Sequence, residues 1–165
     1  MDIVIRAALP AEYDELGDLT AQAYLDDGLL SFEHNEFYLA VLRDVAGRAA
    51  DGEVLVADHD GRVLGGVTFA APGSPLADIA APHEAEFRML AVSRDARGRG
   101  AGEALVRACM ARARALEGVT HLVLSTQAAM LGAHRIYQRL GFIRTPERDW
   151  APVPAVPLLT YRAEL

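Results

Sequence analysis

The glycine-rich run at residues 97–102 is the part of this sequence best suited to bind a ligand. It follows an apolar, strand-like stretch at 86–92 and opens a helix-like stretch at 101–116. We expect its glycines to adopt positive φ and to let the backbone approach a ligand closely. Free N–H groups in such a loop and at a helix start attract anions, and Arg97 and Arg99 add forked cationic donors. The run therefore predicts a diphosphate-binding loop.

Two common phosphate-binding loops do not fit these residues. A P-loop requires a lysine after its last glycine, whereas all 16 Lys and Arg residues of this chain are arginine. The dinucleotide fingerprint needs a third glycine or alanine near the start of a βαβ unit. Counted from Gly98 and Gly100, that third position is Glu103, and the run lies past the middle of the chain. A nucleotide-binding domain is therefore disfavoured.

The remaining pattern is Arg-x-x-Gly-x-Gly, formed by Arg97, Gly100 and Gly102, and it resembles the acetyl-CoA loop of the GCN5-related N-acetyltransferase (GNAT) family. The likeness extends to residues 85–92, which resemble that family's fourth strand. It also extends to residues 133–142, which resemble its last helix running into a Gly-Phe strand start. One departure is Met130, which stands where the family usually carries asparagine.

The resemblance implies one N-acetyltransferase domain over residues 1–165. The implied fold is α/β, a GNAT-like acyl-CoA N-acyltransferase whose central, mostly antiparallel mixed sheet has splayed fourth and fifth strands and is flanked by helices. The sequence itself predicts an antiparallel hairpin, because β-rich runs at 53–58 and 62–70 are joined by an Asp-Gly turn. A chain of 165 residues can bury enough surface to fold without a disulfide or a metal.

Capping residues and apolar periodicity predict the remaining elements. Pro10 opens a first helix. Asn35 caps a second helix, whose apolar stripe comprises Phe37, Val41 and Val45. A later helix and the remaining strands are expected at 129–140, and at 2–7, 121–125, 142–144 and 158–162.

Glu86 is the candidate general base. A protonated amine cannot attack a thioester, so acetyl transfer to an amine needs a group that accepts its proton. Glu86 matches the position where the resembled family often places that base, and Phe87 and Leu90 are expected to shield it and raise its pKa. Glu84 is the second choice. A solvated carboxylate at the strand edge, with an ordered water or a remote residue as the base, stays open as the alternative.

The resemblance also assigns the contacts to acetyl-CoA. The family's splayed strand supplies a backbone N–H to the thioester oxygen, which implies Leu90 here. Main-chain groups of Leu90 and Val92 would bond the pantetheine arm like an added strand. Arg135 and Arg139, on the last helix, could reach the far end of the cofactor, but a surface role is favoured. The implied cofactor-binding residues are Leu90, Ala91, Val92, Arg97, Gly98, Arg99, Gly100, Ala101 and Gly102.

Tyr137 is the candidate acid that protonates the departing CoA thiolate. It occupies the position of the family's helix tyrosine, four residues before Gly141. A phenol with a reference pKa of about 10 can protonate a thiolate. The alternative is a tyrosine that packs on the core with its hydroxyl in water. His134 is expected to point to another face, as a surface or capping residue.

Other reactive side chains are expected to be structural. Cys109 lies on the apolar side of its helix, and we interpret it as core packing. Trp150 lies in a proline-rich segment, where we favour a cover over the core rather than a wall of an acceptor pocket. His59, His83 and His121 lack ligand-like spacing with cysteines or carboxylates, so we expect no metal site.

The net charge of −7 is unevenly distributed. Residues 1–60 carry a balance of −11, whereas residues 61–165 carry +4. A basic C-terminal part suits a polyanionic cofactor such as CoA, and an acidic N-terminal part repels nucleic acid and attracts a cationic amine. Surface acids that only keep the protein soluble are the alternative interpretation.

These patterns favour an N-acetyltransferase that acts on a small-molecule or peptide amine. No secretory signal or membrane-spanning run is visible, and a single cysteine suits a reducing compartment, so we expect a cytoplasmic protein with no membrane or nucleic-acid partner. A homodimer stays open. The main alternative is a non-catalytic module that senses acyl-CoA, an interpretation to which Met130 lends support.

Overall fold

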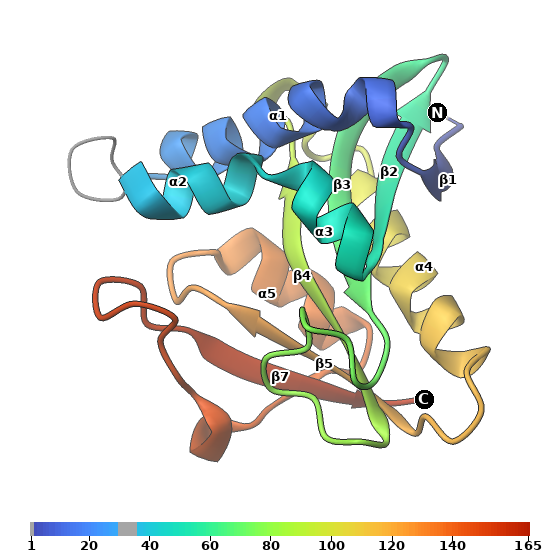
Figure 1. Ribbon diagram of the computed structural model, residues 1–165, viewed down its shortest axis with the longest axis vertical. Helices are drawn as coiled ribbons and strands as arrows, with labels where there is room; N and C mark the ends of the chain where they lie inside the picture. The colour runs from blue at the N-terminus through green and yellow to red at the C-terminus, as the bar shows by residue number, and fades with distance from the viewer. Residues whose placement is uncertain (1, 30–35) are drawn as a thin grey trace.

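A seven-stranded sheet with helices on both faces forms the protein (Figure 1), as seen in a computed structural model that describes residues 2–29 and 36–165. The strands are β1 (Val4–Ala7), β2 (Glu53–His59), β3 (Arg62–Ala70), β4 (Glu84–Val92), β5 (His121–Thr126), β6 (Ile143–Arg144) and β7 (Leu159–Glu164). The helices are α1 (Tyr13–Asp26), α2 (Glu36–Arg43), α3 (Val45–Asp51), α4 (Ala101–Arg114) and α5 (Leu131–Arg139).

The sheet is mostly antiparallel, as predicted, with the strand order β1-β2-β3-β4-β5-β7-β6. Only β4 and β5 run parallel among the described pairs, and their register extends from Glu84 opposite His121 to Phe87 opposite Leu124. Beyond that point β4 continues to Val92 without β5 as a partner. The predicted splay between these two strands is therefore confirmed, and it leaves one backbone edge of β4 open.

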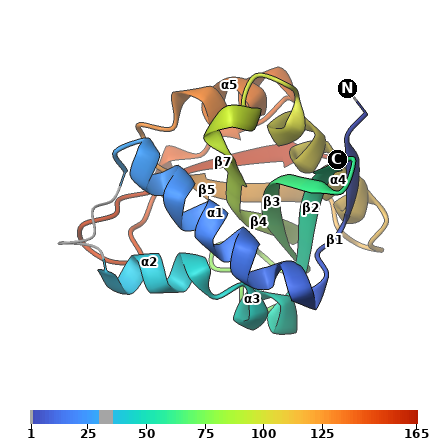
Figure 2. The ribbon, with the colours of Figure 1, turned by 90° about the horizontal axis from the view of Figure 1, so that it is seen from above.

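The helices form two layers (Figures 1 and 2). Helices α1, α2 and α3 lie over one face of the sheet, and α4 and α5 lie over the other. Side chains alternate along a strand, so Ala85 and Phe87 of β4 join the core beneath α4, where Cys109 is fully buried as predicted. Glu84 and Glu86 consequently face the layer of α1 to α3.

The predicted hairpin between β2 and β3 is confirmed. Its turn places Asp60 at φ 50° and Gly61 at φ 83°, the left-handed conformation that two-residue hairpin turns require. Among the described residues, no helix combines the length and the apolar composition needed to cross a membrane.

The predicted second helix is present as α2, but its predicted apolar stripe was wrong at Phe37. Two helices, α2 and α3, occupy this segment and are separated at Asp44, whose side chain accepts the N–H of Gly47 and starts α3. Leu39 and Leu42 form the buried face of α2, where Phe37 is 74% exposed, whereas Val45 at the start of α3 is buried as predicted. The predicted cap, Asn35, lies outside the described residues.

Candidate functional site

The loop before α4 has the backbone geometry of an anion-binding loop. Gly98 and Gly100 adopt φ of 77° and 87°, and Gly100 caps the N-terminus of α4. Successive amides in such a conformation, together with the free N–H groups of a helix start, form a concavity for an anion. These two glycines behave as predicted.

Gly102 does not adopt positive φ, contrary to the prediction, because it lies within the first turn of α4. Its small size serves packing instead. A β-carbon at this position would lie 3.1 Å from Cδ1 of Ile136, so glycine lets α4 approach α5 closely.

Strand β4 contains a bulge where it leaves β5. Gly66 pairs with Ala91 and Thr68 pairs with Arg88, so Met89 and Leu90 lie opposite a single residue of β3. Met89 adopts φ 58°, a left-handed conformation that is uncommon for a residue with a side chain. A bulge leaves one residue unpaired in the ladder. Backbone groups near Leu90 therefore become available to a ligand at the splay.

A groove of about 650 Å³, here called the glycine-loop groove, runs from this bulge to the start of α4. Its wall includes eight of the nine residues predicted to bind the cofactor, namely Leu90, Ala91, Val92, Arg97, Gly98, Gly100, Ala101 and Gly102. The ninth, Arg99, is exposed and lies outside this wall. The structure thus brings the predicted cofactor residues together around one concave site.

Charged side chains in the wall of the glycine-loop groove are largely paired. Arg97 donates to Asp27 at 2.6 Å, and Arg139 donates to Glu103 at 2.7 Å. Arg135 also lines the groove and makes no hydrogen bond or ion pair with the described part of the chain. Arg135 and Arg139 are exposed, as expected, and their helix borders the groove, so both can also reach a ligand there.

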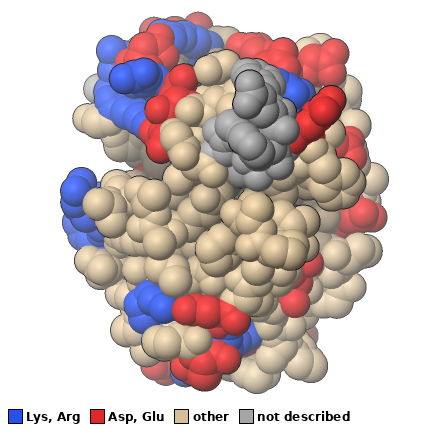
Figure 3. All heavy atoms as spheres, turned by 90° about the vertical axis from the view of Figure 1, so that its left-hand side faces the viewer, with Lys and Arg blue, Asp and Glu red and all other residues tan. Residues whose placement is uncertain are grey.

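A smaller cavity, with a free volume of about 40 Å³ and here called the Glu86 cavity, adjoins the groove. Tyr24 and Met130 line both spaces, so the two meet at these side chains. Figure 3 shows the side of the molecule on which the end of α1 and the segments after β5 lie, with mostly uncharged side chains over the middle of this face. A ligand in the groove and one in the cavity would therefore lie next to each other at the splay.

Trp150 lines the Glu86 cavity, and its Nε1 donates to Ser125 Oγ at 2.8 Å. The sequence favoured a cover over the core for this residue. Trp150 does pack with buried apolar residues, including Leu158, but its ring also forms part of the cavity wall. A lone tryptophan in a loop-like segment gave no signal to decide between the two roles.

Glu86 is buried in the wall of this cavity, with 1% of its surface exposed. Its Oε1 accepts backbone N–H groups from Ile79 and Ala80 at 2.9 and 3.0 Å. Burial raises the pKa of Glu86 to about 7, although the two N–H donors favour the charged form. A carboxyl group with this pKa can exchange protons at neutral pH.

Glu84, the second choice for the base, has a different environment. Its carboxylate accepts from Arg148 at 2.7 Å, and Arg162 lies 4.0 Å away. Burial is the largest influence and would raise the pKa of Glu84, but the hydrogen bonds from Arg148 and from the Ala81 N–H, together with the positive charge of Arg148, outweigh it, and the pKa is lowered. Glu84 lines neither the Glu86 cavity nor the glycine-loop groove. Its ion pair with Arg148 therefore has a structural role.

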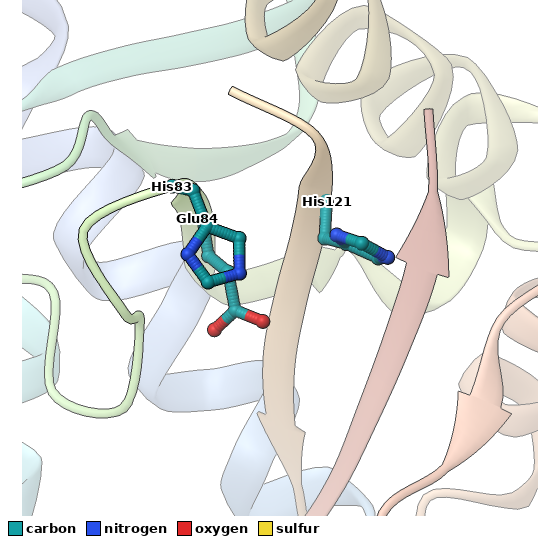
Figure 4. A group of neighbouring side chains, drawn as sticks. All are labelled: His83, Glu84 and His121. Carbon is teal, nitrogen blue, oxygen red and sulfur yellow. The ribbon is translucent and has the colours of Figure 1, made fainter. Parts of the chain in front are cut away.

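His83, Glu84 and His121 gather at the start of β4 and β5 (Figure 4), with one potential ligand atom of each within 4.8 Å of the others. The prediction that these histidines lack ligand-like spacing was wrong, because the parallel pairing places Glu84 opposite His121. His121 is far from His83 and Glu84 in the sequence, so their proximity could not be predicted from spacing along the chain. The Glu84 carboxylate already neutralises Arg148, so this carboxylate is not a free ligand.

Tyr137 lies beneath the splay on the opposite face of the sheet from Glu86. It is 2% exposed and contacts the rings of Phe87, Phe142 and Tyr161. Burial raises its pKa, and a side-chain contact with Thr126 partly offsets the rise. Tyr137 is not among the described residues that line either space, whereas Thr126 lines the Glu86 cavity.

His134 is buried, contrary to the expectation of a surface residue. It is 8% exposed, and its Nε2 lies 3.0 Å from the carbonyl oxygen of Gln127 and 3.4 Å from Thr126 Oγ1. Its ring also packs against Tyr161. Burial lowers the pKa of His134, so the neutral ring anchors α5 to the end of β5.

Comparison with known proteins finds sequence similarity to an acetyltransferase. The chain is 38% identical over 104 residues to mycothiol acetyltransferase of Cellulomonas flavigena. That match covers 61% of this chain but only 30% of the relative, so the chain spans less than a third of the relative's length.

Solved structures share the fold at low sequence identity. PaiA N-acetyltransferase of Thermoplasma acidophilum, in complex with coenzyme A, matches with a TM-score of 0.77 at 15% identity over all of both chains. A GNAT-family acetyltransferase of Staphylococcus aureus Mu50 matches with a TM-score of 0.75 at 13% identity over 99% of each chain. A sequence model described as the acetyltransferase (GNAT) family matches residues 13–142, most of the sequence, and the chain therefore belongs to the GNAT acetyltransferase family.

Proposed function

We propose that this protein transfers the acetyl group of acetyl-CoA directly to a primary amine of a small molecule or a peptide. The observation that carries the proposal is the meeting of the glycine-loop groove and the Glu86 cavity at Tyr24 and Met130. The groove has an anion-binding loop at its wall, and the cavity holds a carboxyl group that can exchange protons at neutral pH. A donor and an acceptor bound in these spaces would react at the splay.

The glycine-loop groove suits acetyl-CoA. Amides around Gly98 and Gly100 would bind the diphosphate together with Arg97. Arg135 also lines the groove, and its guanidinium group is unpaired within the described chain, so it could bind an anion without breaking an ion pair. The open edge of β4 from Leu90 to Val92 would bond the pantetheine arm as an added strand, because β5 has diverged there.

The Glu86 cavity suits the amine. Glu86 would take a proton from the ammonium group, and the freed nitrogen would form a bond to the thioester carbon. The backbone N–H of Leu90 would stabilise the oxygen as negative charge develops on it. As the carbon–sulfur bond breaks, the thiolate would take up a proton that Tyr137 supplies through the hydroxyl group of Thr126, which contacts Tyr137 and lines the cavity.

Binding measurements test the donor assignment. Isothermal titration with acetyl-CoA, NAD and ATP should give binding to acetyl-CoA alone. Binding of NAD or ATP in its place would contradict the proposal. Arg97→Ala should weaken acetyl-CoA binding, whereas Arg114→Ala, at an exposed position at the end of α4, should not.

A non-catalytic acyl-CoA sensor is the second candidate function, because Met130 lines both spaces where the family usually carries asparagine. Turnover distinguishes it. If acetyl-CoA binds but no amine in a broad panel releases free CoA, the sensor is favoured over the enzyme. Release of CoA that depends on an amine excludes the sensor.

A further inference from the structure

The charges of the Glu86 cavity are nearly balanced. Among the described residues of its wall, three are charged, and two of these, Asp78 and Arg88, form an ion pair at 2.7 Å. The third, Glu86, is about half protonated at neutral pH because burial raises its pKa to about 7. The cavity therefore lacks the excess of negative charge that would attract a polycationic amine, despite the acidic N-terminal half of the chain.

Much of the remaining wall is apolar or aromatic. Tyr24 and Met89 are buried side chains, while Tyr38 and Trp150 present partly exposed rings. Aromatic walls of this kind bind flat or branched apolar groups through buried area. The occupant should consequently carry an apolar or aromatic part.

Hydrogen-bond donors without a partner remain at this wall. Arg88 uses Nη1 for both Asp78 and the carbonyl oxygen of Leu76, so its Nε and Nη2 make no hydrogen bond within the described chain. The side-chain Nε2 of Gln127 is buried and likewise unpaired there. The unpaired buried donor of Gln127 is costly, and the partly exposed guanidinium group of Arg88 bonds carboxylates with particular strength. The wall therefore favours an occupant that brings an anionic acceptor group.

We propose that the acceptor is a free amino acid with an apolar or aromatic side chain, with its amine beside Glu86 and its carboxylate beside Arg88. This inference rests on the proposed acetyl transfer. Glu86 and Arg88 are two positions apart on β4 and so project from the same face, about 7 Å apart along the strand. The amine and the carboxylate of an α-amino acid share one carbon atom, so both groups fit between these side chains.

The reaction balances without a further reactant. The ammonium group of the amino acid loses one proton to Glu86 and a second as the amide forms. The nitrogen–carbon bond forms while the carbon–sulfur bond of the thioester breaks. The CoA thiolate takes up one proton, so the products are an N-acetyl amino acid, CoA and one released proton.

Three probes that differ only at the carboxylate test this inference, namely L-phenylalanine, L-phenylalaninamide and phenethylamine. Hydrogen bonds to a charged group contribute about 1.5–3 kcal/mol, so kcat/KM should be about 10- to 100-fold higher for phenylalanine than for phenethylamine. Equal values, or a preference for the amide, would overturn the amino-acid assignment and leave acetyl transfer intact. Absence of product with every amine would instead contradict the proposed function itself.

Variants of the two residues of the Asp78–Arg88 ion pair should change the preference for phenylalanine over phenethylamine in opposite directions. Arg88→Gln should reduce the preference for phenylalanine over phenethylamine at least tenfold, whereas Arg88→Lys should keep part of it. Asp78→Asn should increase the preference, because it removes the negative charge that competes for Arg88. The exposed Arg114→Gln serves as the matched control and should leave the preference unchanged. A preference that stays unchanged in folded Arg88→Gln and Asp78→Asn, checked by thermal melts, would overturn the inference.

Discussion

Arg97 donates a hydrogen bond from Nη1 to Oδ1 of Asp27 at 2.6 Å, and this ion pair ties the end of α1 to the loop before α4. Both residues line the glycine-loop groove. Asp27 therefore occupies a guanidinium group that the proposed function assigns to a phosphate. Cofactor binding would exchange one anionic partner of Arg97 for another.

We predict that Asp27→Asn binds acetyl-CoA more tightly than the wild-type protein. Partly exposed ion pairs contribute up to about 1 kcal/mol, so Kd should fall by up to about fivefold in isothermal titration at low salt. Asp26→Asn changes the neighbouring exposed residue, which bonds Gln22 instead, and should leave Kd unchanged. Weaker binding by Asp27→Asn would show that the ion pair preorganises Arg97 rather than competing for it.

We predict that Glu86→Gln lowers kcat/KM by about 10²- to 10⁴-fold, the usual contribution of a general base. The pKa of Glu86 is raised to about 7 by burial, so wild-type kcat/KM should rise with pH through that value as the carboxyl group loses its proton. The variant should lack this ascending limb. A variant with the same pH profile as the wild type would exclude Glu86 as the base.

The raised pKa of Glu86 also makes the stability of the folded protein depend on pH. The folded-state pKa of Glu86, about 7, exceeds the ordinary value of 4.5. Between these two pH values the unfolded chain has lost the proton of Glu86 while the folded protein still holds it, and this difference destabilises the folded state. The free energy of unfolding should therefore fall as pH rises from 4.5 to 7, by about 3 kcal/mol in total. Glu86→Gln removes this penalty. Urea denaturation should show the variant to be more stable than the wild type at pH 8 but not at pH 4, and a pH-independent difference would contradict this origin.

We predict that Tyr137→Phe lowers kcat by about 10- to 100-fold and changes KM for acetyl-CoA by less than about twofold. Tyr161→Phe removes a hydroxyl from a neighbouring ring of the same aromatic cluster and serves as the control, with kcat close to that of the wild type. Steady-state kinetics of both variants provide the measurement. Equal losses in both variants would indicate that Tyr137 acts through packing alone.

Features coded by adjacent residues could be predicted from the sequence. The Asp-Gly turn at residues 60–61 and the left-handed positions of Gly98 and Gly100 follow from local backbone preferences. The mixed sheet and its splay followed from the family resemblance of residues 85–142 rather than from apolar periodicity.

Features that depend on tertiary contacts could not be predicted. The bulge at Met89 has no local signal, because methionine shows no preference for positive φ. The burial of His134 depends on Gln127 and Thr126 across the end of β5, and the place of Trp150 depends on Ser125. Arg135 lines the groove from α5, which packs close to α4 at Gly102, and spacing along the chain does not reveal this arrangement.

Simultaneous measurement of CoA thiol release and of the N-acetylated product tests the proposed acetyl transfer most directly. Purified protein with acetyl-CoA and a panel of primary amines, among them phenylalanine and phenethylamine, should release one CoA for each acetylated amine formed. Release should require both the protein and the amine, and it should be strongly reduced in Glu86→Gln. Tight binding of acetyl-CoA without an acetylated product from any amine would contradict the claim that this protein is an N-acetyltransferase.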